Sequence, residues 1–171
     1  MTDCRLSLRE RVFVRGANDD IATDILPMSR PGYRELIAVV PVLAVCVTYW
    51  WFLGHRRDYL GHFAAGYGAS LCAMLVWLKS LAAERYAALA ASSILPATFV
   101  CILLGTATEA TIFRIARFDE IDWCNQSLGA VLAGAAMLAF TTTERPPDRE
   151  FDASIILSII VLMIGGWFAF T

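Results

Sequence analysis

The chain has 171 residues, of which 58% are hydrophobic, and its mean hydropathy is +0.59. An ordinary soluble domain contains about 45–50% apolar residues, so this composition disfavours that class and predicts a membrane protein. The net charge is −2 and no basic stripe with interleaved aromatic residues is present, which argues against a nucleic-acid partner.

The N-terminal segment differs in composition from the rest of the chain. Residues 1–35 contain six arginines and six acidic residues, and Pro27, Pro31 and Gly32 interrupt any regular element there. We therefore expect residues 1–33 to form a cytoplasmic arm and residues 34–171 to form a transmembrane helical domain.

Five apolar stretches follow the arm. A helix needs about 20 apolar residues to cross the core of a bilayer, and short polar connections would make successive spans antiparallel. The third stretch contains Pro96, which neighbouring membrane helices can tolerate. We predict an all-α integral membrane bundle whose five spans cover about residues 35–53, 59–78, 86–113, 122–140 and 153–171.

The distribution of basic residues predicts the orientation of these spans. The arm, the 79–85 turn and the 141–152 loop would share one side and carry ten Lys or Arg residues, against four on the other side. Because positive charge accumulates on the cytoplasmic side, we expect a cytoplasmic N-terminus.

Polar residues recur where the second, third and fourth spans would meet the extracytoplasmic side. Asp58 and His62 share one helix face at i, i+4, Asp122 and Asn125 share another at i, i+3, and Glu109 lies near the end of the third span. Charges inside a membrane are costly and often functional. We therefore predict a pocket between these three spans, with Asp58, His62, Glu109, Asp122 and Asn125 as its ligand-binding residues.

The same residue types are also compatible with catalysis, metal binding or a purely structural role. A carboxylate beside a histidine can act as a base or proton relay, and Asp, Glu and His can bind a metal, although no HExxH spacing is present. Asp58 and Asp122 could cap helix N-termini, His62 could be the partner of Asp58, and Asn125 could hydrogen-bond between helices. We expect no catalytic residue, metal or cofactor.

The polar residues also carry a resemblance to a known family. The segments Asp58-x3-His62-Phe63, Gly105-x3-Glu109 and the run from Arg117 to Gly134 (R-x-D-x2-D-x2-N-x3-G-x4-G) resemble the VanZ-like family of small membrane proteins. The namesake of that family is associated with low-level resistance to the glycopeptide teicoplanin. The resemblance implies a multi-pass protein of the bacterial cytoplasmic membrane with a role in the cell envelope.

These observations support three hypotheses of function. The leading one is a VanZ-like envelope protein that binds a lipid-linked or glycopeptide-type ligand at its extracytoplasmic helix ends. The alternative is an accessory structural subunit of a larger membrane complex, with the polar residues holding helices together. A third is a membrane enzyme that uses His62 with Glu109 or Asp122. The expected partners are the lipid bilayer, a lipid-linked ligand and, in the alternative, other membrane subunits.

Overall fold

The computed structural model describes residues 33–54, 56–111, 119–141 and 145–170, with side chains from residue 39 onward. These residues belong to one compact unit, Gly32–Thr171. All of the predicted arm except its last residue, Tyr33, lies outside the described residues.

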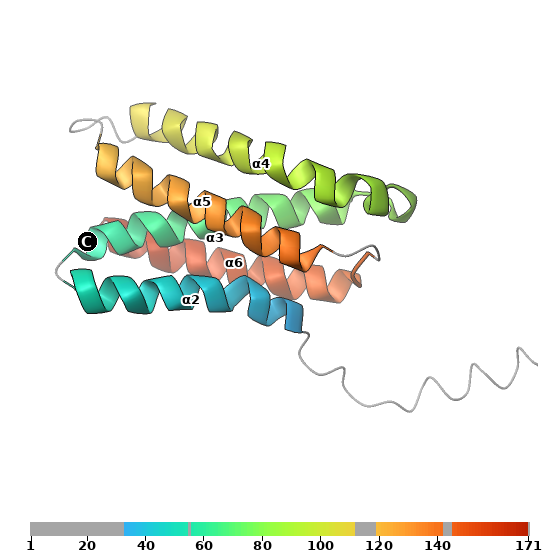
Figure 1. Cartoon of the computed structure of the whole chain (residues 1–171), viewed down its shortest axis with the longest axis horizontal. Helices are drawn as coiled ribbons and strands as arrows, with labels where there is room; N and C mark the ends of the chain where they lie inside the picture. Colours follow the sequence, from blue (N-terminus) through green and yellow to red (C-terminus); the bar gives the residue numbers. More distant parts are fainter. Residues whose placement is uncertain (1–32, 55, 112–118, 142–144, 171) are drawn as a thin grey trace, which may run out of the picture. The chain divides into compact units, whose positions relative to one another are not determined.

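Every regular element in the described part of the chain is an α-helix (Figure 1), which confirms the predicted all-α class. Four of the helices are long and apolar enough to cross a membrane, and α2 contributes a shorter apolar stretch, Val39–Leu53. The chain is therefore a multi-span helical membrane protein that associates with a lipid bilayer. The helices are α2 (Tyr33–Leu53), α3 (Arg57–Ser80), α4 (Ala83–Thr111), α5 (Glu120–Phe140) and α6 (Asp148–Ala169).

The helices α3, α4, α5 and α6 each begin two to five residues earlier than the hydrophobic pattern predicts, and local chemistry explains the starts of α5 and α6. The α5 helix begins at Glu120 because Asp119 caps it, accepting hydrogen bonds from the backbone N–H groups of Ile121 at 2.8 Å and Asp122 at 3.3 Å. The α6 helix begins at Asp148, directly after Pro147, so the polar residues that open it are helical. The predicted 141–152 loop was therefore too long. Acidic side chains are favourable in the first turn of a helix, and a hydropathy pattern assigns such residues to loops.

The α3 helix lies at the centre of the bundle and contacts all four other helices (Figure 1). Over half of its apolar stretch, 56%, is buried inside the protein, against 17% for α4, which packs only on α5 and α3. The helix that carries Asp58 and His62 is thus the one around which the others assemble.

Glycines allow α3 to approach its two main neighbours at backbone distance. A Cβ atom on Gly129 of α5 would lie 2.3 Å from the carbonyl oxygen of Phe63, and one on Gly66 of α3 would lie 2.3 Å from that of Gln126. On the other side of α3, a Cβ atom on Gly165 of α6 would lie 2.3 Å from the backbone nitrogen of Ala65. Without water to drive association, such close backbone packing is a principal source of helix affinity in lipid.

The chain direction places the predicted polar residues at one end of the bundle. There α3 and α5 begin while α2, α4 and α6 end, and we call it the site end. The opposite end has polar contacts of its own: Lys79 pairs with Asp152, and Arg145 pairs with Asp148 at 2.8 Å. Charged residues at both ends and apolar surfaces between them are the distribution expected of a bundle that spans a bilayer.

Candidate functional site

The side chains of His62 and Asp122 lie side by side and join α3 to α5 at the site end. The imidazole Nε2 lies 3.4 Å from Asp122 Oδ2, and both side chains are largely buried, with 15% and 17% of their surface exposed. The alternative in which His62 pairs with Asp58 is therefore wrong. The pair joins two helices that run in the same direction, side by side, and each residue lies within the first two turns of its helix.

Asp58 instead pairs with Arg56, the residue just before α3. Arg56 donates to both carboxylate oxygens, Nε to Oδ1 at 3.2 Å and Nη2 to Oδ2 at 2.9 Å, and this hydrogen bonding raises the pKa of Arg56 above its ordinary value. Neither Asp58 nor Asp122 caps its helix: α3 has no side-chain cap, and Asp119 caps α5. Asp58 is still close enough to Asp122 for their charges to interact, so it belongs to the edge of the same cluster.

Asn125 is buried and holds α5 to α2. Its side-chain carbonyl oxygen accepts a hydrogen bond from the hydroxyl of Tyr49 at 2.7 Å. This contact confirms the hypothesis that Asn125 hydrogen-bonds between helices. The Tyr49 ring also packs on Phe63 of α3, with a centroid separation of 5.7 Å, so Tyr49 links all three helices at this level.

Replacing Tyr49 with phenylalanine should lower the free energy of unfolding by about 1 kcal/mol, because it removes the hydroxyl and leaves a buried acceptor on Asn125 unpaired. Thr48→Val is the matched control. The Thr48 hydroxyl is exposed and bonds only to the Ala44 carbonyl of its own helix, so that change should have little effect. SDS-induced unfolding in mixed micelles, followed by circular dichroism, measures the free energy of unfolding of both variants. Equal losses for the two variants would contradict the interhelical role.

Glu109 is the most deeply buried acid of the predicted set. It is 5% exposed on the last turns of α4, and its Oε2 atom has no hydrogen-bond partner within the described residues. The nearby hydrogen bond from Trp123 Nε1 to Thr106 Oγ1, 2.8 Å long, fixes this part of α4 against the start of α5. Asp122 also retains one buried oxygen, Oδ1, without a partner among these residues.

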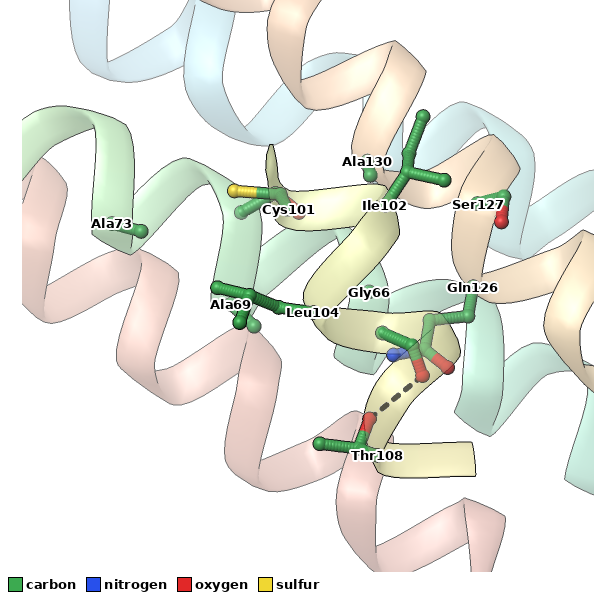
Figure 2. Close-up of a pocket in the computed structure, with 12 residues that line it drawn as sticks. Gly66, Ala69, Ala73, Cys101, Ile102, Leu104, Thr108, Gln126, Ser127 and Ala130 are labelled. Carbon is green, nitrogen blue, oxygen red and sulfur yellow. Dashed lines mark hydrogen bonds between the residues drawn. The ribbon is translucent and has the colours of Figure 1, made fainter. Parts of the chain in front are cut away.

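A cavity of about 240 Å³ lies between α3, α4 and α5, the three helices that the sequence singles out (Figure 2). Its walls are mostly small or apolar, with hydroxyl, thiol and amide groups interspersed. None of the five predicted site residues lines it. Its lining residues are Gly66, Ala69, Ser70, Ala73, Cys101, Ile102, Leu104, Gly105, Thr108, Gln126, Ser127 and Ala130.

Three residues that contribute to this region were not predicted from the sequence. Tyr49 resembles the other aromatic residues at the end of its span, and Arg56 resembles an ordinary loop cation. Gln126 could have been found, because it is a polar residue one turn after Asp122 and directly follows Asn125. Its side chain lies across Gly105, where an added Cβ atom would meet Gln126 Nε2 at 2.6 Å.

The arrangement brings together His62 and Asp122, with Asp58 nearby, and places Glu109 on the adjoining helix. Within the described residues, no group of three or more His, Cys, Asp or Glu side chains has the geometry to hold a metal ion. What the site offers instead is the Asp122 carboxylate beside the His62 imidazole and the buried carboxylate of Glu109 on α4, each with one oxygen that has no hydrogen-bond partner among the described residues. Such a site can accept hydrogen bonds from a ligand with a polar head.

Comparisons with known proteins do not identify a relative. No protein-family model, no curated protein and no solved structure matches the chain. The resemblance to the VanZ-like family therefore depends only on the sequence segments quoted above.

Proposed function

We propose that the protein is a VanZ-like membrane protein of the bacterial cell envelope that binds the polar head of an amphipathic, lipid-linked or glycopeptide-type ligand at the site end of the bundle. In this proposal the site end faces outward, in agreement with the excess of basic residues in the other set of loops. Glu109, His62 and Asp122 contact the ligand head, Asn125 holds α5 to α2 through Tyr49, and Asp58 lies at the edge of the cluster, paired with Arg56.

The observation that carries this proposal is the burial of Glu109 with a carboxylate oxygen that has no hydrogen-bond partner among the described residues. A buried polar atom without a partner costs about 1–3 kcal/mol, and inside a membrane such groups usually have a functional partner. The 240 Å³ cavity between the same helices gives a ligand room for an apolar portion.

The proposal is tested by resistance to teicoplanin in a susceptible bacterial host. Expression of the protein should raise the minimal inhibitory concentration, and Glu109→Gln or Asp122→Asn should abolish the increase. Glu120→Gln is the matched control, because Glu120 is an exposed acid in the first turn of α5 at the same end. It should retain the full increase.

Immunoblots of membrane fractions must show equal amounts of each variant. No change in inhibitory concentration on expressing the unaltered protein would refute the glycopeptide form of the proposal. A full increase with Glu109→Gln would show that the buried carboxylate is not part of the site.

A second candidate, an accessory subunit of a membrane complex, is favoured by the surface of α4. Only 17% of its apolar stretch is buried in the chain, and Leu95, Phe99 and Leu104 are 79%, 61% and 62% exposed. This exposed surface is compatible with a partner subunit and equally with lipid. Purification in a mild detergent distinguishes the two candidates: a stoichiometric partner protein supports the subunit, and a homogeneous single chain argues against it.

A further inference from the structure

The cavity and the polar residues of the site end are in register with each other. Each of three polar residues lies four positions from a residue of the cavity wall. His62 precedes Gly66, Glu109 follows Gly105, and Asp122 precedes Gln126. Residues four apart lie on one helix face, one turn or about 5.4 Å along the axis. In all three helices that turn leads toward the site end. The three polar residues, which we call the polar layer, therefore lie one helical turn beyond the cavity wall, toward the site end.

The polar layer has unused hydrogen-bond acceptors. Asp122 Oδ1 and Glu109 Oε2 are both buried and have no partner within the described residues, whereas Asp122 Oδ2 contacts His62. An ionised carboxylate accepts hydrogen bonds and cannot donate them. The ligand head that fits these atoms therefore carries hydrogen-bond donors, and a positive charge on it would strengthen each bond.

The cavity below is suited to a hydrocarbon chain. Ala69, Ala73 and Leu104 contribute apolar surface, and Figure 2 shows wall residues from all three helices around it. Thr108 lines the cavity and directly precedes Glu109, so the wall continues into the polar layer. Its hydroxyl already donates a hydrogen bond to the Gly105 carbonyl at 2.8 Å, so this donor is used within the wall.

We propose that the cavity and the polar layer together bind an amphiphile with a primary ammonium head on a hydrocarbon chain. The ammonium group donates to Glu109 Oε2 and Asp122 Oδ1, and the chain occupies the cavity past Gln126. This inference names the ligand class for the proposed function above and depends on it. An anionic head, such as a phosphate, would be repelled by the two carboxylates.

The thiol of Cys101 provides a local readout, because it lines the cavity and is partly exposed. The full chain, with its other four cysteines replaced by serine, is reconstituted in phosphatidylcholine nanodiscs, which contain no primary amine. The rate at which N-ethylmaleimide alkylates Cys101 is then measured with increasing amounts of a long-chain alkylamine, the alkyl phosphate of equal length, or a short-chain amine. Should Cys101 react too slowly to follow, Leu104→Cys, at a 62% exposed position of the same wall, replaces it as the reporter.

The long-chain amine should protect the thiol at a concentration at least about tenfold lower than the alkyl phosphate does, equivalent to about 1.4 kcal/mol in binding. The short-chain amine should protect poorly, since it lacks the chain that fills the cavity. Glu109→Gln should remove most of the preference for the amine, and Glu120→Gln, which changes an exposed acid at the same end, should leave it intact. If Glu109→Gln does not fold, Asp122→Asn tests the same point.

Equal protection by the amine and the phosphate would overturn the ammonium assignment and leave an amphiphile site standing. Reactivity that no amphiphile changes would overturn the cavity as a ligand site. The resistance measurement remains independent of both results, so failure of the ligand class and failure of the proposed function can be told apart.

Discussion

Gly165→Ala is expected to lower the free energy of unfolding by about 1–3 kcal/mol, whereas Gly166→Ala, one residue further along α6, should leave it unchanged or raise it by up to about 1 kcal/mol. A Cβ atom on Gly165 would lie 2.3 Å from the Ala65 nitrogen and 2.8 Å from the Ala64 carbonyl carbon. Both are backbone atoms of α3, so the helices themselves must separate. A Cβ atom on Gly166 would meet nothing within 4 Å.

The two glycines form a matched pair. They share a helix, a depth along the bundle and the same gain in helix propensity on replacement by alanine, so the difference between the variants isolates the α3–α6 contact. SDS-induced unfolding of both variants, monitored by circular dichroism, gives this difference. Equal stabilities would mean that α3 and α6 are not in backbone contact, and would contradict the central position of α3.

The fold could be predicted from the sequence because membrane spanning imposes a length and a composition on each helix. The ends of the apolar stretches locate α3, α4 and α5 to within three residues at the ends that the structure describes. The largest error is five residues, at the start of α6, where Asp148 and Glu150 open the helix, since hydropathy assigns a first-turn carboxylate to the preceding loop.

The candidate site was predicted in part. The topology places Asp58, His62, Glu109, Asp122 and Asn125 at one end of the bundle, and helix periodicity groups them by face. Periodicity within each helix cannot specify the rotation of one helix against another. That rotation decides that His62 meets Asp122 rather than Asp58, and that Asn125 meets Tyr49.

The cavity was predicted between the correct helices but with the wrong lining. Small residues such as Gly66, Gly105 and Ala130 give no chemical signal, and they line the cavity because they leave space. The sequence shows that these helices have small faces, which predicts close packing. It does not show where the close approach of two helices at one glycine leaves an unfilled space beside another glycine.

A double-mutant cycle on His62→Gln and Asp122→Asn should give a coupling energy of about 1–2 kcal/mol, whereas the cycle on Arg56→Gln and Asp58→Asn should give about 0.5 kcal/mol or less. The two pairs lie at the same end of the bundle and differ in exposure. The His62 and Asp122 side chains are 15% and 17% exposed, and those of Arg56 and Asp58 are 40% and 41% exposed. Water weakens the second pair, and only the first pair joins two helices.

The size of this coupling separates the two roles left open for the polar layer. If His62 and Asp122 serve only to hold α3 to α5, then Asp122→Asn loses stability and any loss of ligand response follows the loss of folded protein. If Asp122 Oδ1, which has no hydrogen-bond partner among the described residues, also binds a ligand, Asp122→Asn loses the ligand response at equal amounts of folded protein, whereas His62→Gln keeps part of it. A coupling below about 0.5 kcal/mol for His62 and Asp122 would contradict the structural role.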